Sequence, residues 1–187
     1  MDTSYHVFNR SNGGRIVFPL HRNYHFFTRK LVRHVAIHGS VLASCLMPTH
    51  FHLVVICAEE SHGPLRQGLG VVLRSYTRAL QRQERFTGSL FQQRTRFLPV
   101  VDRLESCITY LHQNPLRAGL VADLSHWPYS SYHTYLDGRA DALCESDRGR
   151  TVAEFPQSKA AFHAMSHNVP WSGERSISPS TEQTVIG

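Results

Sequence analysis

Two histidines, His50 and His52, are the first residues of this chain whose types and spacing could do chemistry. They open an apolar run that reaches Ile56 and is typical of a buried β-strand. Side chains alternate between the two faces of a strand, so both imidazoles should share one face, while Phe51 points to the other. Two adjacent imidazoles suggest a metal site more than an apolar core, although the tripeptide alone also fits ordinary hairpin histidines.

A tyrosine and an asparagine about sixty residues downstream, Tyr110 and Asn114, extend this hypothesis. Residues four apart lie one above the other on a helix, so the phenol and the amide should lie together. If that flank faces the strand, His50, His52 and Asn114 would surround one cation with the phenol beside it. Mixed nitrogen and oxygen ligands predict a divalent metal cofactor, Mg²⁺ or Mn²⁺, with open water positions.

Such a constellation suits chemistry on a phosphodiester. A cation on a non-bridging oxygen polarises the diester, and a phenol, whose ordinary pKa is about 10, becomes a nucleophile where positive charge favours phenolate. Attack by Tyr110 would exchange one diester for another, so a cut strand could be rejoined without ATP. The rival nucleophiles have no comparable metal-site partner; they are Tyr129, Tyr132 and Tyr135.

The elements that must position these residues follow a β-α-β-β-α-β order with a further helix. We expect strands at 5–8, 41–47, 50–57 and 96–101, and helices at 21–38, 65–84 and 102–114, with Pro115 ending the last helix. This order predicts an α+β protein of the ferredoxin-like split type. Its antiparallel sheet should carry helices on one face, and the last helix should carry Tyr110.

The length and composition predict one main domain. Of the 187 residues, 41% are hydrophobic, which is enough for a core. We assign residues 1–136 to the catalytic domain, 137–171 to a weakly patterned extension with a short helix near 155–168, and 172–187 to a disordered tail. The chain shows no signal-peptide layout and no apolar run of about 18 residues, and its four cysteines fit neither a zinc knuckle nor a disulfide framework. We therefore expect a cytoplasmic protein.

The charge is uneven along the chain. Residues 1–100 hold 13 Lys and Arg against four Asp and Glu, whereas residues 101–187 hold seven against ten. A basic front half predicts a polyanionic partner, although arginine-biased codon usage would explain the scarcity of lysine equally well. The second helix carries arginines opposite its apolar stripe, which favours phosphate contacts over a merely solvated face; they include Arg74, Arg78 and Arg82.

At these motifs the chain resembles the HUH single-strand endonucleases, and more closely the IS200/IS605-type and REP-associated tyrosine transposases. The run from Met47 to Val55 carries the His-hydrophobic-His signature. The most specific match is YLHQNPLRAGLV at 110–121, followed by WPYSSY at 127–132. Further matches are YHV at 5–7, NR at 9–10 and GSLFQQR at 88–94. The resemblance covers about residues 4–136.

The resemblance implies an enzyme that cuts and rejoins single-stranded DNA at hairpin-forming palindromic repeats through a 5′-phosphotyrosine. It makes Tyr110 the nucleophile and His50, His52 and Asn114 the metal-site residues. We expect single-stranded or hairpin DNA as the partner, a monomer or homodimer, and association with the nucleoid in the bacterial cytoplasm. The alternatives are a hairpin-binding protein without catalysis and an HUH replication initiator or relaxase. The candidate DNA contacts are Asn9, Arg10, Arg74, Arg78, Arg82, Arg94, Arg96 and Arg117.

Overall fold

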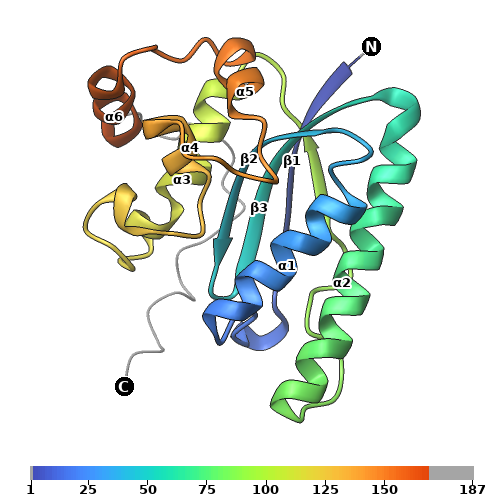
Figure 1. Ribbon diagram of the computed structural model, residues 1–187. Helices are drawn as coiled ribbons and strands as arrows, with labels where there is room; N and C mark the ends of the chain where they lie inside the picture. The colour runs from blue at the N-terminus through green and yellow to red at the C-terminus, as the bar shows by residue number, and fades with distance from the viewer. Residues whose placement is uncertain (1, 169–187) are drawn as a thin grey trace.

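The computed structural model describes residues 2–168 and is built around one four-stranded sheet (Figure 1). Its spatial order is β2-β3-β1-β4, and all neighbours are antiparallel. The strands are β1 (Asp2–Arg10), β2 (Ser40–Met47), β3 (His50–Ala58) and β4 (Arg96–Pro99). The α-helices of the described part are α1 (His21–His34), α2 (His62–Glu84), α3 (Leu104–Arg117), α4 (Tyr132–Asp137), α5 (Ser146–Val152) and α6 (Lys159–Asn168). The predicted α+β class with an antiparallel sheet is confirmed.

The hairpin formed by β2 and β3 agrees with the prediction, since Met47 pairs with His50 across a two-residue turn. Both strands are buried along almost their whole length. Strands covered on both faces are continuously apolar rather than alternating, which explains the long hydrophobic run after His52.

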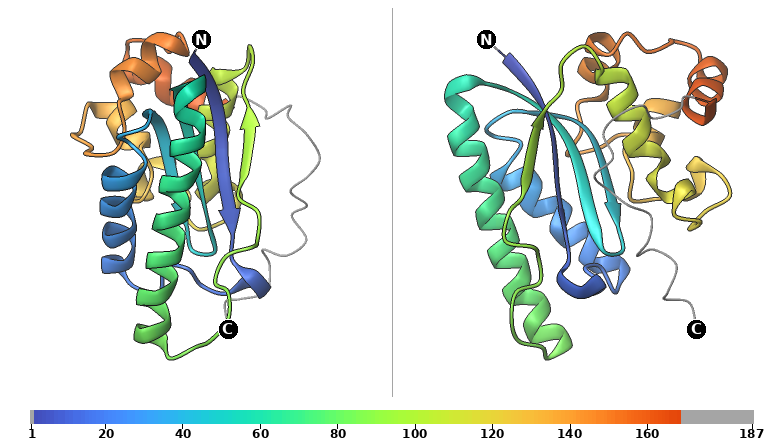
Figure 2. Two further views of the ribbon diagram at one scale, coloured as in Figure 1. Left: turned by 90° about the vertical axis from the view of Figure 1, so that its right-hand side faces the viewer. Right: turned by 180° about the vertical axis from the view of Figure 1, so that it is seen from behind.

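Helices α1 and α2 cover one face of the sheet, as expected for the ferredoxin-like unit, and α3 covers part of the other face (Figure 2). On one face, α1 and α2 pack against residues such as Leu53 and Val55 in the first core. On the other face, α3 packs mainly on β2 and β3 and contributes Ile108 and Leu111 to a second core. The apolar stripe of the predicted last helix supplies this contact.

The helix α3 continues past Pro115, contrary to the prediction that this proline ends it. A proline removes the N–H that would bond to the carbonyl four residues earlier, here that of Leu111. The side-chain Nδ2 of Asn114 lies 3.4 Å from that carbonyl and donates to it instead. The helix then closes normally, because the N–H of Ala118 donates to the carbonyl of Asn114 at 2.9 Å.

The extension after residue 136 contributes to the second core. Phe155 and Phe162 are buried against the rings of α4, and Phe162 is fully inaccessible. The short helix expected near 155–168 corresponds to α6, whereas α4 and α5 lacked a recognisable pattern. The tail predicted at 172–187 lies outside the described residues.

The four cysteines are buried and unbridged. Burial raises the pKa of the Cys107 thiol to about 12, which is the behaviour of a small apolar residue rather than a reactive one. None of the helices within residues 2–168 has the length and apolar composition that crossing a membrane requires.

Candidate functional site

The strand β3 places the two predicted histidines on the same face, as the alternation required. The ring centroids of His50 and His52 lie 5.0 Å apart. Helix α3 crosses above them, and the ring of Tyr110 meets that of His52 edge-on with centroids 6.2 Å apart. All three side chains are buried, with exposed fractions of 7%, 2% and 8% respectively. Residues separated by about sixty positions in the chain therefore share one site.

A third histidine, His6, belongs to the same cluster and was not among the predicted site residues. Its Nε2 lies 2.9 Å from Nδ1 of His52, and its ring meets Tyr110 edge-on at 6.3 Å. It comes from β1, where Phe8 pairs with His52, so positions 6 and 8 share the face of the histidine pair. The motif YHV at 5–7 was a signal for His6 in the sequence, but its place in the cluster depends on β1 and β3 being neighbours.

Hydrogen bonds orient the two rings of β3. The Nδ1 of His50 lies 3.0 Å from Oγ1 of Thr49, while Nδ1 of His52 is engaged by His6. Among the described residues, no hydrogen bond occupies Nε2 of either ring. With the proton on Nδ1, each Nε2 carries a lone pair, which is the arrangement of a metal-binding histidine with an outer partner.

The histidines of this cluster are neutral at pH 7. Burial lowers the pKa of His6 to about 4, and burial together with the charge of Arg10 lowers that of His50 to about 4. The pKa of His52 falls well below its usual value because of burial, and then because of its neighbours His50, His6 and Arg10. A metal binds the neutral form of imidazole. These rings are already neutral, so they can act as ligands without releasing a proton.

Asn114 lies one turn after Tyr110 on α3 and is 9% exposed. Its Nδ2 donates to the backbone carbonyls of Tyr110 and Leu111, at 3.3 and 3.4 Å. These bonds leave the amide oxygen as its possible ligand atom. Within residues 2–168, Asn114 forms no hydrogen bond with the histidines, whereas Tyr110 is in ring contact with His6 and His52.

Arg117 lies beside the tyrosine. Its guanidinium carbon is 5.5 Å from the centroid of the Tyr110 ring, and its Nε donates to Oε1 of Gln113 at 3.2 Å. A fixed positive charge near a phenol favours its ionised form. Arg117 was predicted as a DNA contact, and the structure places it against the candidate nucleophile.

Two further predicted DNA contacts lie on the face of the histidines. Arg10 pairs with His50 across β1 and β3, and Arg96 pairs with Phe8 across β1 and β4. Cross-strand partners point to the same side of a sheet. Arg10 is half-buried and Arg96 is exposed, on the part of this face beyond the strands that α3 mainly covers. Arg10 and Arg96 therefore make the surface beside the site positively charged.

Asn9 lies on the opposite side of β1 and is 3% exposed. Its Nδ2 donates to the carbonyl of Gln92 at 3.1 Å and to Oγ1 of Thr95 at 2.9 Å, and its Oδ1 accepts from the N–H of Arg10. The side chain holds the segment before β4 rather than presenting a free amide at the surface.

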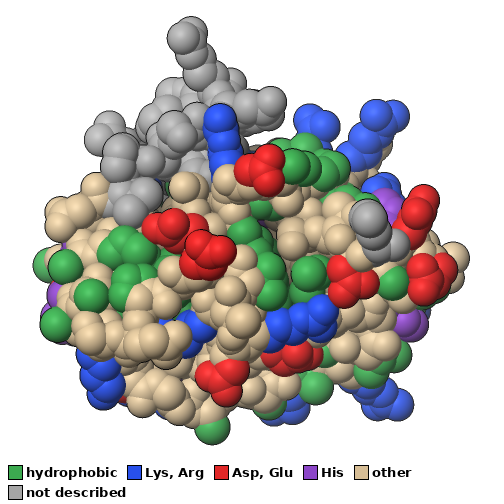
Figure 3. All heavy atoms as spheres, turned by 90° about the horizontal axis from the view of Figure 1, so that it is seen from above, with side chains coloured by type: hydrophobic (Ala, Val, Ile, Leu, Met, Phe, Trp, Pro, Cys, Tyr) green, Lys and Arg blue, Asp and Glu red, His purple; other side chains and the backbone are tan. Residues whose placement is uncertain are grey.

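A basic groove of about 500 Å³ opens between α2 and β4 and contains Arg66, Arg94 and Arg96 in its lining. The predicted contacts Arg74, Arg78 and Arg82 are exposed along α2, which covers the sheet face opposite the histidines. The structure therefore does not bring these three arginines to the site. Seen from above the view of Figure 1, both signs of charge are interspersed, so that end of the molecule is not uniformly basic (Figure 3).

The rival tyrosines are engaged elsewhere. Tyr129 stacks on Tyr24 with centroids 3.5 Å apart, the hydroxyl of Tyr132 lies 2.7 Å from Nδ1 of His163, and that of Tyr135 donates to the carbonyl of Leu42. Burial raises the pKa of all three phenols. Of the four candidate nucleophiles, Tyr110 is the one in ring contact with the histidine cluster.

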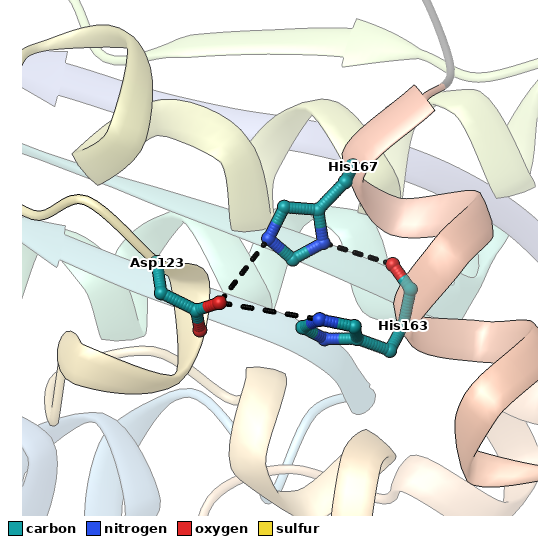
Figure 4. A group of neighbouring side chains, drawn as sticks. All are labelled: Asp123, His163 and His167. Atoms are coloured by element: carbon teal, nitrogen blue, oxygen red, sulfur yellow. Dashed lines mark hydrogen bonds and ion pairs between the residues drawn. The ribbon is translucent and has the colours of Figure 1, made fainter.

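A separate group of side chains also has metal-ligand chemistry. In the described part of the chain, Asp123, His163 and His167 form the group of three or more His, Cys, Asp or Glu whose ligand atoms all lie within 4.8 Å of one another (Figure 4). This is not the predicted set. Its signal in the sequence is the four-residue spacing of the two histidines, but Asp123 lies forty residues earlier.

Comparisons with known proteins identify a similar fold. No protein-family model and no curated protein matches the sequence. A solved structure of a REP-associated tyrosine transposase bound to a REP hairpin aligns over 94% of this chain and 93% of its own, with a TM-score of 0.55 and 16% identity. The chain shares the fold of that transposase. At this level of identity, the likeness to the transposase concerns the fold alone.

Proposed function

We propose that this protein is a metal-dependent tyrosine transposase of the REP-associated type, which nicks and rejoins single-stranded DNA at hairpin-forming repeats. The observation that carries the proposal is the edge-on contact of Tyr110 with His52 and His6, within a fold shared with a transposase. The order β2-β3-β1-β4 and the order of elements along the chain support a ferredoxin-like arrangement with an added helix for the tyrosine.

His50, His52 and Asn114 would hold the divalent cation, Mg²⁺ or Mn²⁺. The residues fit this role because both imidazoles are neutral, no described residue forms a hydrogen bond with either Nε2, and the amide oxygen of Asn114 is not used by its own helix. When bound, such a cation polarises a phosphodiester and fixes its orientation. His6 orients His52 from the neighbouring strand.

Tyr110 would attack the phosphorus with loss of its phenolic proton. A bond forms between the tyrosine Oη and phosphorus, and the bond from phosphorus to the 3′-oxygen breaks, which releases a 3′-hydroxyl and leaves a 5′-phosphotyrosine. Attack by another 3′-hydroxyl reverses the exchange and returns the proton to the phenol. Arg117 supports the step, since its charge lies beside the ring.

The same face would bind the DNA. Arg10 and Arg96 lie beside the histidines and would contact phosphates there, while Arg94 would contact a phosphate from the groove next to β4. Hairpin DNA is the proposed partner because the structure with the shared fold is bound to a REP hairpin.

The decisive experiment is a covalent-adduct assay on a labelled hairpin oligonucleotide with Mn²⁺. The wild type should form an adduct that mass spectrometry maps to Tyr110. Tyr110→Phe should abolish the adduct and retain DNA binding, because it removes only the hydroxyl. Tyr129→Phe is the matched control, since it removes a hydroxyl outside the site and should leave the adduct intact. An adduct that survives in Tyr110→Phe would exclude this mechanism, and binding without cleavage by the wild type would favour the non-catalytic hairpin-binding alternative.

A further inference from the structure

A second cluster of ligand-type side chains lies where α6 packs against the segment that follows α3 (Figure 4). Asp123 is the N-cap of the short 3-10 helix at Leu124–His126, and His163 and His167 are four residues apart on α6. The Oδ2 of Asp123 lies 3.9 Å from Nε2 of His163 and 3.7 Å from Nε2 of His167. Three ligand atoms from distant parts of the chain therefore converge on one point.

The other polar atoms of these side chains are already engaged. The Oδ1 of Asp123 accepts from the N–H and the hydroxyl of Ser125, at 2.7 and 2.5 Å, which leaves Oδ2 facing the histidines. The Nδ1 of His167 lies 2.9 Å from the backbone carbonyl of His163. A carbonyl can only accept, so Nδ1 carries the proton and the neutral ring has its lone pair on Nε2. The Nδ1 of His163 lies 2.7 Å from the hydroxyl of Tyr132.

We propose that Asp123, His163 and His167 form a binding site for a transition-metal dication of the Zn²⁺ class. Two imidazole nitrogens and one carboxylate oxygen are a ligand set for Zn²⁺, and histidines four apart on a helix present both rings on one side. Imidazole nitrogens bind Zn²⁺ more strongly than Mg²⁺, so Zn²⁺ is the preferred ion for this ligand set. The side chains are 26% to 43% exposed, so water can reach the site and complete the tetrahedron.

The spacing of the ligand atoms is close to what Zn²⁺ needs. Bonds of about 2.0–2.2 Å at tetrahedral angles separate ligand atoms by roughly 3.3–3.6 Å. The two observed distances to Asp123 are 3.7 and 3.9 Å, and all three ligand atoms lie within 4.8 Å of one another, so the side chains would have to move slightly closer to hold the ion. The hydrogen bonds on both Nδ1 atoms are outer contacts of the kind that orient metal-binding histidines.

The ion would fasten α6 to the segment after α3. Helix α6 is otherwise anchored by the buried ring of Phe162 and by Gln113 on α3, whose Nε2 donates to the carbonyl of Ser166 at 2.7 Å. Gln113 also accepts the hydrogen bond from Arg117. The site therefore stabilises the extension against the helix that carries Tyr110, and it is distinct from the cation site proposed on β3.

The test is Zn²⁺ binding by the full-length protein after removal of metals with a chelator. Bound Zn²⁺ is measured by mass spectrometry of the metal, and Tm is followed as Zn²⁺ is added. The wild type should gain Tm with Zn²⁺, and Mg²⁺ should not replace it. Asp123→Asn, which keeps the cap on Ser125 but removes the charge, should bind Zn²⁺ at least ten-fold more weakly at this site. His163→Gln with His167→Gln should lose one equivalent of Zn²⁺ and the gain in Tm.

Two controls separate this site from other histidines. His126→Gln replaces an exposed histidine of the neighbouring turn and should leave Zn²⁺ binding unchanged. His50→Gln with His52→Gln removes the pair on β3 and should preserve the Zn²⁺-dependent gain in Tm. Equal Zn²⁺ binding by the wild type, Asp123→Asn and the α6 double variant would overturn the proposal. DNA cleavage is not the readout, so failure here does not bear on the nuclease assignment.

Discussion

Nε2 of His6 and Nδ1 of His52 lie 2.9 Å apart, in a hydrogen bond that joins the two central strands beneath the tyrosine of α3. A partner on the far nitrogen of a metal-binding histidine fixes its tautomer and raises its basicity. His6 is thus placed to orient His52 as a ligand of the proposed cation.

His6→Phe removes this bond while keeping an aromatic ring of similar shape. We expect the Mn²⁺ concentration for half-maximal cleavage to rise about 10- to 100-fold, with cleavage recovered at saturating Mn²⁺. Circular dichroism checks that the fold is retained. His38→Phe, at a half-buried position after α1, is the control for loss of an imidazole. An unchanged Mn²⁺ dependence in His6→Phe would show that the bond is structural only.

Asn114 has two separable roles: it donates a hydrogen bond within α3, and it is a proposed ligand of the cation. Asn114→Ala leaves the Leu111 carbonyl without a donor and should lower the free energy of unfolding by about 1–3 kcal/mol. Adding Pro115→Ala restores a backbone N–H for that carbonyl and should recover much of the loss.

A DNA-cleavage assay distinguishes the structural role of Asn114 from its proposed role as a ligand. We expect the double variant to regain stability in urea unfolding but to remain impaired in Mn²⁺-dependent cleavage. If cleavage returned together with stability, Asn114 would act only as a helix component, and the proposed ligand set would lose its oxygen.

The arginines on the two sides of the sheet should differ in their effect on DNA binding. Arg96→Ala removes a charge on the face of the histidines, and the slope of log K against log salt should fall by about 0.7–0.9. Arg78→Ala, on the helix that covers the opposite face, is the matched control and should leave the slope nearly unchanged. Titrations of a labelled hairpin at several salt concentrations measure both. If Arg78→Ala reduced the salt dependence more than Arg96→Ala, the DNA would be assigned to the other side of the sheet.

Acid should destabilise the protein through its buried histidines. Burial lowers the pKa of His112 to about 3, so the unfolded chain binds a proton that the folded chain does not between pH 6.5 and about 3. Stability therefore falls as the pH is lowered through this window, by roughly 1 kcal/mol per pH unit for each such histidine.

His112→Gln should reduce the dependence of the free energy of unfolding on pH, because one fewer proton is taken up on unfolding. Urea unfolding between pH 7 and 4.5 measures this dependence. Ser131→Ala removes the partner of His112 but keeps the titrating ring, so it should lower stability without flattening the slope. A slope that is identical in the wild type and His112→Gln would mean that the buried ring does not titrate in this way.

Local periodicity explains what the sequence could predict about the site. The period of two in His50-Phe51-His52 and the four-residue spacing of Tyr110 and Asn114 fix which side chains share a face. The contact of Tyr110 with His52 depends on packing of α3 over β3, and the apolar stripe of that helix gave a reason to expect it.

The features that could not be predicted from the sequence depend on contacts between distant segments, or on a side chain that replaces a backbone hydrogen-bond donor. His6 lies in the matched motif YHV, but its contact with His52 depends on the register of β1 and β3. Asp123 and His167 meet through packing of an extension with weak periodicity. The continuation of α3 past Pro115 depends on a side-chain amide that replaces a backbone donor, which propensity rules do not include.

Both edges of the sheet disfavour strand addition, and this bears on how two copies could assemble. Along the outer edge of β2, residues 129–145 supply backbone hydrogen bonds to Leu46, Ser44 and Val41. At the other edge, β4 has only four residues and ends in Pro99, which offers no N–H. A homodimer would therefore associate through helices or loops, and each copy would keep its own sheet.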